Sequence, residues 1–198
     1  MTDAPENKER IAKRMARAGL CSRRDAERWI ADGRVEVNGK KLESPAFTVS
    51  ATDLIVVDGK PLPKKERSRL WRYHKPVGLV TSHRDEKGRD TVFDKLPEDM
   101  PRVISVGRLD INSEGLLLLT TDGELAYRLT HPSYQVAKTY LVKVTGTPNA
   151  RKLKEIERGV ELEDGKTAPA AVEIVRTAGP SSWLLITIVE GRNRVIRR

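Results

Sequence analysis

The stretch Val106–Thr120, VGRLDINSEGLLLLT, places a short charged loop directly before a run of four leucines. The run is short and is followed by Asp122-Gly123, which predicts a strand buried on both faces. We therefore expect Arg108 and Asp110 to lie beside rigid structure, close to the core. Because burying a bare charge is costly, a carboxylate there needs a partner or a function. On these residues alone, a turn-forming Asp110 with Arg108 as its ion partner remains an alternative.

The composition is that of a basic globular protein. The 198 residues hold one large domain or two small ones, and 38% of them are apolar, which suffices for a folded core. The formal charge of +9 comes from 37 basic and 28 acidic side chains and favours a polyanionic partner. No stretch of ~18 apolar residues is present, and the N-terminus lacks an apolar signal core. We therefore expect a soluble, cytoplasmic protein. We also expect a monomer that does not bind membranes.

Cysteine and histidine usage argues against disulfides and metal sites. Cys21 is the only cysteine, so no intrachain disulfide can form, and its neighbours predict a small buried side chain at a corner between helices. His74, His83 and His131 are scattered without ligand spacing. We predict that no metal is bound.

Residues 8–62 are predicted to form a small module of two helices and a hairpin sheet. A first helix ends near Gly19, where a positive φ is favoured. Ser22 with Asp25 three residues later predicts the capped start of a second helix. Asn38-Gly39 is a strong signal for a two-residue hairpin turn.

Basic side chains are concentrated on the two predicted helices, at spacings that bring many of them to one face. This pattern predicts RNA binding, although a solvated helix face with interspersed acids is the alternative. The segments Leu20–Glu27 (LCSRRDAE) and Gly33–Gly39 (GRVEVNG) closely resemble the S4 RNA-binding domain. The resemblance implies that the paired helices lie on structured RNA. The RNA-contacting residues that it implies are Arg17, Ser22, Arg23, Arg24, Arg28 and Asn38.

Pro61–Arg69, PLPKKERSR, has two prolines and no apolar periodicity, and predicts a basic linker over residues 63–69. Residues 70–198 follow as a second domain with many strand patterns and separate helices. We expect an α+β domain with a mixed, mainly antiparallel sheet and flanking helices. The sequence stops at Arg198 within a basic segment, without a cap or polar tail, so we expect the C-terminal end of this domain to be incomplete.

Four motifs in the second domain together resemble the pseudouridine synthases, in particular the bacterial ribosomal RNA branch with an N-terminal S4 domain. They are Lys75–Gly78 (KPVG), Gly107–Thr120, Lys138–Val142 (KTYLV) and Glu190–Arg198 (EGRNRVIRR). Residues 85–97 and the basic linker are most similar to enzymes that modify large-subunit ribosomal RNA. The small-subunit enzymes of the branch remain an alternative.

The resemblance implies a reaction that breaks the N1–C1′ bond of uridine, turns the base and joins C1′ to C5, with no cofactor, metal or redox change. The family's single aspartate falls on Asp110, which must be ionised to act as nucleophile or base. The family's late arginine falls on Arg197 and keeps that carboxylate charged. Tyr140 is implied to stack on the uracil.

The target base has to be flipped out of stacked RNA to reach such a site. Arg108 is expected to fill the vacated space or to hold the neighbouring phosphate. One departure is Val195, where the family usually has glutamine. The remaining substrate-binding residues that we expect near the cleft are Lys75, Lys138, Arg192, Asn193 and Arg194.

The expected partner is ribosomal RNA or a ribosomal assembly intermediate. A non-catalytic S4-type RNA-binding or ribosome-assembly protein is the competing function. It predicts RNA binding without isomerisation and indifference to Asp110.

Overall fold

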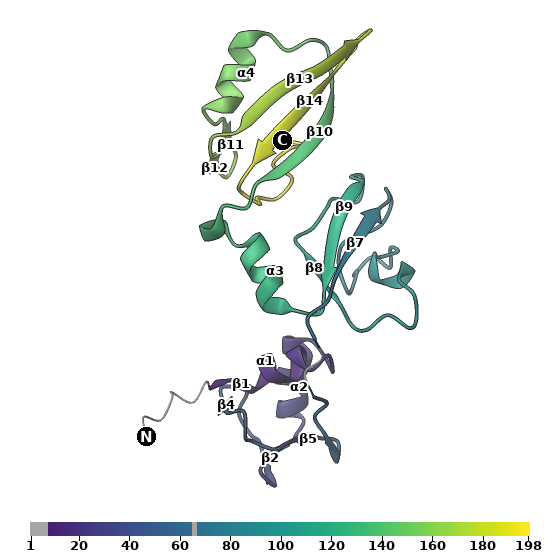
Figure 1. The fold of residues 1–198 in the computed structure, drawn as a ribbon, viewed down its shortest axis with the longest axis vertical. Helices are drawn as coiled ribbons and strands as arrows, with labels where there is room; N and C mark the ends of the chain where they lie inside the picture. Colours follow the sequence, from purple (N-terminus) through teal and green to yellow (C-terminus); the bar gives the residue numbers. More distant parts are fainter. Residues whose placement is uncertain (1–7, 65–66) are drawn as a thin grey trace. The chain divides into compact units, whose positions relative to one another are not determined.

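The computed structural model describes residues 8–64 and 67–198 (Figure 1). Residues 65 and 66 of the predicted linker lie outside the described residues. The chain divides into two compact units at Ala126/Tyr127, a boundary within helix α3 (Gly123–Thr130). Among the described helices, none has the length and apolar character needed to cross a membrane.

The N-terminal module of the first unit contains helices α1 (Ile11–Arg17) and α2 (Arg23–Ala31). The predicted cap of α2 is confirmed: the backbone N–H of Asp25 donates to the Ser22 hydroxyl at 3.0 Å, and that hydroxyl donates to the Asp25 carboxylate at 2.6 Å. These hydrogen bonds lower the pKa of Asp25, because they favour its charged form. Gly19, between the helices, has a φ of +77°, as predicted.

The strands of this module form a four-stranded antiparallel sheet in the order β3-β2-β5-β6, beside the pair β1-β4. The predicted hairpin turn is confirmed, since Asn38 and Gly39 have φ values of +52° and +77°. The strand bounds are β1 (Glu9–Arg10), β2 (Val35–Val37), β3 (Lys40–Lys41), β4 (Thr48–Val49), β5 (Ile55–Val57) and β6 (Lys60–Pro61).

One apolar core joins the helices of this module to its strands. Ile11 and Met15 of α1, Ile30 of α2 and Val35 of β2 are almost completely buried in it. Cys21 lies in the same core with 4% of its surface exposed, and burial raises the pKa of its thiol to about 11. The prediction of a small buried cysteine is therefore confirmed.

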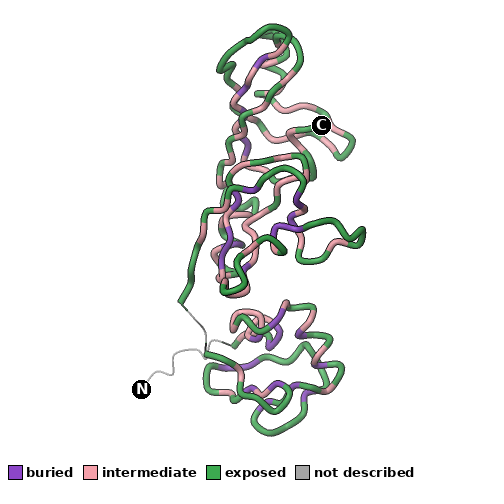
Figure 2. The backbone as a smooth tube through the Cα atoms, turned by 90° about the vertical axis from the view of Figure 1, so that its right-hand side faces the viewer, coloured by how far each residue is buried: buried purple, intermediate pink, exposed green. Residues whose placement is uncertain are grey.

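A second sheet of the first unit contains β7 (Leu70–Lys75), β8 (Ile104–Val106) and β9 (Gly115–Thr120) in the antiparallel order β7-β9-β8. The four-leucine run forms a strand, as predicted, and this strand is the central one of the sheet, but the prediction that both of its faces are buried is wrong. Figure 2 colours the chain by burial. Leu117 and Leu119 are 3% and 1% exposed, whereas Leu116 is 66% exposed. An antiparallel sheet packed on one face produces this alternation. The core below includes Val92, just before the 3₁₀ turn η1 (Phe93–Lys95).

The second unit has the antiparallel sheet β10-β14-β13, in which β14 is central and alternates between buried and half-buried residues. Helix α4 (Ala150–Glu157) contacts β13, and Asn149 caps it by accepting the Lys152 N–H. The remaining bounds are η2 (Pro132–Tyr134), β10 (Lys138–Thr145), β11 (Glu161–Leu162), β12 (Gly165–Lys166), β13 (Ala171–Ala178) and β14 (Ser181–Ile188).

The predicted α+β class is confirmed. Among the described residues, every paired strand is antiparallel, and a single parallel bridge joins Val80 to Thr91.

Candidate active site

The loop that carries Asp110 connects β8 to β9 and is held through its backbone. The buried Lys75 ammonium donates to the carbonyls of Asp110 at 3.0 Å, Ser113 at 2.8 Å and Pro76 at 3.0 Å. Lys75 is 0% exposed, and this burial lowers its pKa, while the charge of Asp110 acts in the opposite direction. The loop is therefore built around a buried cation at the end of β7.

The prediction that Lys75 binds phosphate is wrong. Its side chain is fully buried, and the three short contacts with carbonyls, together with a longer one to Ile111 at 3.5 Å, use the donors of the ammonium group. The sequence shows a lysine beside Pro76 and Gly78, but only the tertiary fold reveals that the side chain turns inward under the Asp110 loop.

Two further donors complete the support of this loop. The Thr81 hydroxyl donates to the carbonyl of Leu109 at 3.0 Å, and the N–H of Gly78 donates to the carbonyl of Ile111 at 2.7 Å. Gly78 has a φ of +90°, a conformation that side chains disfavour, so the glycine of the first motif has a backbone reason. Thr81 was not singled out from the sequence, because a threonine in a short strand-like segment gives no signal of such a contact.

This scaffold presents the two side chains that the sequence singled out. Asp110 is half-buried and Arg108 is exposed. A carboxylate on a loop whose backbone carbonyls are held by buried donors has little freedom to move. The catalytic role of Asp110 and the flipping role of Arg108 stay predictions.

In the second unit, the structure brings Tyr140 and the segment carrying Arg197 onto one apolar cluster. Tyr140 lies on β10 and packs against the cluster of Leu184, Ile186 and Ile188. Val195 and Ile196 pack against the same cluster, directly before Arg197. Where the family has a polar glutamine, Val195 thus contributes to packing. Arg197 itself is exposed.

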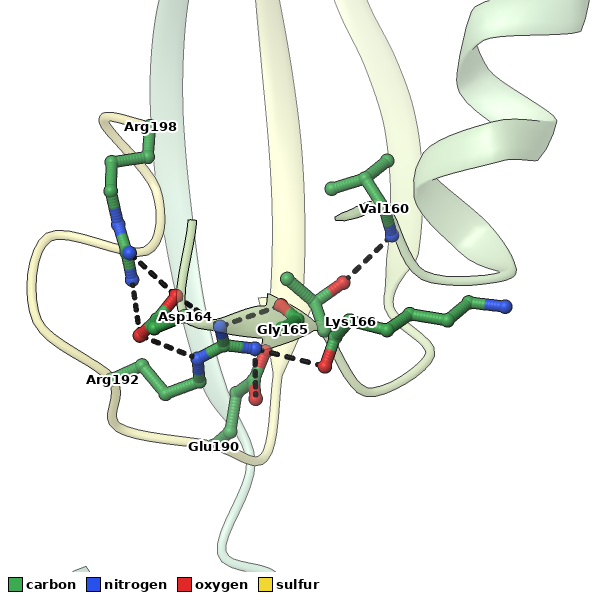
Figure 3. Close-up of polar contacts among 8 residues, drawn as sticks. Val160, Asp164, Gly165, Lys166, Glu190, Arg192 and Arg198 are labelled. Carbon is green, nitrogen blue, oxygen red and sulfur yellow. Dashed lines mark hydrogen bonds and ion pairs between the residues drawn. The ribbon is translucent and has the colours of Figure 1, made fainter. Parts of the chain in front are cut away.

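The C-terminal segment is tied to the β11–β12 hairpin through Asp164 (Figure 3). The Asp164 carboxylate accepts hydrogen bonds from Arg192 and from Arg198, and the shorter of the two bonds from Arg198 is 2.6 Å long. Arg192 also donates to the carbonyls of Gly165 at 2.7 Å and Lys166 at 2.9 Å. Hydrogen bonds from the two guanidinium groups hold the pKa of Asp164 well below its usual range, and the bonds from Arg192 have the larger effect.

In this structure the guanidinium of Arg192 bonds to the hairpin, and its predicted contact with substrate phosphate stays a prediction. The sequence did not single out Asp164. Its only local signal was the turn dipeptide Asp164-Gly165, which says nothing of arginines 28 and 34 residues later.

The other predicted substrate-binding residues of this unit differ in their surroundings. Lys138 donates to the carbonyls of Val136 at 2.8 Å and Val189 at 3.2 Å, and so joins the start of β10 to the end of β14. Asn193 and Arg194 are exposed. Phosphate or substrate contacts of these three residues stay predictions.

The S4-like module presents some of its predicted RNA-binding residues and uses others for the fold. Arg23 and Arg24 are exposed at the start of α2. Arg28 forms an ion pair with Asp25 at 2.8 Å, and Arg17 forms one with Glu9. Arg23 and Arg24 are therefore the best placed to meet a phosphate.

Ser22 and Asn38 have structural roles in this module, and their contacts with RNA stay predictions. The Ser22 hydroxyl belongs to the cap of α2. The Asn38 side chain donates to Asp53 at 2.7 Å and accepts the Leu54 N–H at 2.9 Å, which fastens the hairpin turn. Small polar side chains at caps and turns commonly satisfy nearby backbone groups in this way.

Comparisons with known proteins agree with this architecture. The family model described as RNA pseudouridylate synthase matches residues 69–198, and the S4 domain model matches residues 9–55. An uncharacterized RNA pseudouridine synthase of Rickettsia bellii is 45% identical over 190 residues, which are 96% of this chain and 82% of that protein. The ribosomal large subunit pseudouridine synthase B of Bacillus subtilis is 43% identical over 192 residues, 96% of this chain and 78% of that protein.

A solved structure is similar as well. A crystal structure of a pseudouridylate synthase matches with a TM-score of 0.64 and 29% identity, covering 96% of this chain and 80% of that chain. The chain therefore belongs to the RNA pseudouridylate synthase family, and it carries an S4 domain at its N-terminal end.

Proposed function

We propose that this chain isomerises one uridine of large-subunit ribosomal RNA to pseudouridine. Two relatives support this RNA over that of the small subunit: the Bacillus subtilis protein, and one of Pseudomonas aeruginosa that is 44% identical over 212 residues and has the same name. The Pseudomonas match covers 54% of that protein. The RNA is met either free or within an assembly intermediate, and the chain acts in the cytoplasm as a monomer.

The observation that carries the proposal is the Asp110 loop. Its backbone is held by Lys75, Thr81 and Gly78, so the carboxylate is presented from a rigid loop at the end of the β8 strand. Such pre-organisation is typical of a group that takes part in a reaction, and an ordinary surface turn does not need this many supporting hydrogen bonds.

In the proposed reaction, the ionised Asp110 acts as nucleophile or base while the N1–C1′ bond of the uridine breaks. The uracil turns, C1′ joins C5, the hydrogen on C5 is lost and N1 gains one, so the substrate is isomerised without net oxidation. Arg197 is the basic residue of the reaction, the role that the resemblance to the family implies for it. Tyr140 stacks on the uracil and limits its movement between the two bonding arrangements.

The RNA has to bring the uridine out of its stack. Arg108, exposed two residues before Asp110, occupies the vacated space or holds the adjacent phosphate. The S4 domain binds folded RNA nearby through its exposed arginines, reading shape and backbone.

The test is incubation of the protein with transcripts of large-subunit and small-subunit ribosomal RNA, followed by mapping of pseudouridine. We expect one modified position in the large-subunit transcript. Asp110→Asn should abolish the product while RNA affinity stays within about twofold, because it removes one charge and preserves shape. Asp99→Asn, the same change at an exposed aspartate of the same unit, should retain full activity.

Product formation by the Asp110→Asn protein would contradict the assignment of the reacting carboxylate. Modification of the small-subunit transcript alone would contradict the proposed substrate and leave the reaction standing. RNA binding without any product from the unaltered protein, on free RNA and on ribosomal particles alike, would favour an assembly role.

A further inference from the structure

We propose that Asp164 is a positioning residue, which fixes the C-terminal segment so that Arg197 faces the reacting uridine correctly. The inference rests on the role proposed for Arg197. It assigns a function to a hairpin carboxylate that neither the sequence motifs nor the family comparisons single out.

Arg197 lies in a short turn whose two sides are anchored differently. Its own N–H and that of Arg198 donate to the carbonyl of Arg194, at 2.9 and 3.0 Å. Arg194 has a φ of +49°, so the chain reverses sharply at this residue. Before Arg197, the side chain of Ile196 packs against the apolar cluster of β14. After it, the side chain of Arg198 reaches the Asp164 carboxylate.

Each oxygen of the Asp164 carboxylate accepts one hydrogen bond from Arg192 and one from Arg198 (Figure 3). Oδ1 accepts from Nη2 of Arg192 and, at 2.6 Å, from Nη1 of Arg198. Oδ2 accepts from Nε of Arg192 at 3.1 Å and from Nη2 of Arg198 at 3.2 Å. Both pairs are bidentate, a geometry that fixes direction as well as distance.

The hairpin provides a firm base for this clamp. Arg192 bonds the carbonyls of Gly165 and Lys166 in addition to the carboxylate, so three consecutive hairpin residues hold it. The side chain of Arg192 is 20% exposed, and that of Arg198 is 25% exposed. Because the network joins residues on both sides of Arg197, it restrains the backbone that aims this side chain.

Removal of the Asp164 charge leaves two guanidinium groups side by side without their shared anion, and their repulsion frees Arg198. Packing of Ile196 remains, so the fold persists while the direction of Arg197 is no longer fixed. A misplaced catalytic group lowers the rate of the chemical step more than RNA affinity.

The experiment measures kcat and KM for the modified transcript, with the melting temperature recorded for every protein. We expect Asp164→Asn to lower kcat about tenfold, since an ångström of misplacement can cost up to about a hundredfold, with KM changed less than about twofold. Arg198→Met removes the same tether from the other side and should give the same loss. Glu163→Gln, the same charge change at the exposed preceding residue, should leave both constants unaltered.

A double variant distinguishes action through Arg197 from loss of stability. In an Arg197→Lys background, Asp164→Asn should have less than about a twofold further effect on kcat, because the group to be positioned is already lost. Restoration of kcat by Asp164→Glu, which retains the charge, would add support.

Unchanged kcat in both Asp164→Asn and Arg198→Met would overturn the inference. An equal fold-decrease of kcat by Asp164→Asn in the native and in the Arg197→Lys background would also overturn it. So would a rise in KM with kcat unchanged. Failure of the proposed function is recognised separately, because it requires that the unaltered protein makes no pseudouridine or that Asp110→Asn and Arg197→Lys retain full activity.

Discussion

Lys75 has a different position in the structure from the one that its residue type predicts. A lysine in a basic protein is expected at the surface, where it meets phosphate. Here the ammonium group is buried and donates to carbonyls of Pro76, Asp110 and Ser113. A buried ammonium group without acceptors would be costly, and these carbonyls satisfy its donors.

Lys75→Met should therefore damage both stability and activity. Methionine fills the space but leaves three carbonyls without this donor, so we expect the free energy of unfolding to fall by about 2–4 kcal/mol. Loosening of the Asp110 loop should also lower kcat by at least about tenfold. Urea denaturation and single-turnover kinetics measure the two effects. Lys87→Met, at an exposed loop position, serves as the matched control, and equal behaviour of the two variants would contradict the structural role of Lys75.

At the level of single residues, the sequence predicted those that local chemistry determines and missed those that depend on distant parts of the chain. The cap formed by Ser22 and Asp25 follows from spacing alone. Apart from Pro76 beside Lys75, the partners of Lys75 and Asp164 named above lie 28 to 38 residues away, at distances in the chain where a single sequence carries no pairing signal.

The capped start of α2 gives a pH-dependent prediction. Hydrogen bonds from Ser22 lower the pKa of Asp25 below its ordinary value of 3.8, so its carboxylate stabilises the fold above that pH, and the contribution disappears as the pH falls through the lowered pKa. Asp25→Asn should cost about 1 kcal/mol at neutral pH and progressively less as the solution is acidified. Urea denaturation followed by tryptophan fluorescence measures this difference. A loss that is independent of pH, or an equal loss in exposed Glu27→Gln, would contradict it.

Strand β9 shows that a run of apolar residues does not reveal which of its side chains are buried. Four consecutive leucines suggest two buried faces, yet only alternate leucines enter the core. A uniform run hides the period of two that a strand imposes. The strand itself, its position before Asp122 and the helix that Asp122 caps were all predictable.

Two identical substitutions in β9 test this one-sided burial. Leu117→Ala should lower the free energy of unfolding by about 2–5 kcal/mol, because it leaves a cavity beside buried Leu119 and Val92. Leu116→Ala, at a position 66% exposed, should change it by less than about 0.5 kcal/mol. Comparable losses in thermal or urea unfolding would show that both faces are covered in solution.

For the whole molecule, composition and charge indicated a polyanionic partner, and the basic helices with their resemblance to the S4 domain indicated RNA. The family comparisons agree with this prediction. The α+β class and the order of nearly all elements followed from alternation and turn residues. The sequence did not predict which basic residues are available to RNA, because that depends on which of them form hydrogen bonds or ion pairs within the fold. Arg192 is committed to a hairpin, whereas Arg23 and Arg24 are exposed.

RNA affinity should consequently depend on salt through the exposed arginines. Arg23→Ala with Arg24→Ala should weaken binding and reduce the slope of log affinity against log salt by about one unit for each lost phosphate contact. Binding measured over a range of potassium chloride concentrations gives this slope. Arg151→Ala, which removes an 89% exposed arginine from α4, is the control, and an equal decrease there would indicate diffuse attraction rather than docking by the S4 domain.

The buried thiol of Cys21 gives the chain a built-in reporter. As the sole cysteine, enclosed at the corner of the two N-terminal helices and almost wholly protonated at neutral pH, it is shielded from alkylating reagents while that module stays closed. Each covalent label then records one opening event of the S4 domain. The rate at which the S4 domain opens can thus be measured by alkylation of Cys21 in the intact enzyme, without a dye or a tag. The measurement can be made both with and without RNA.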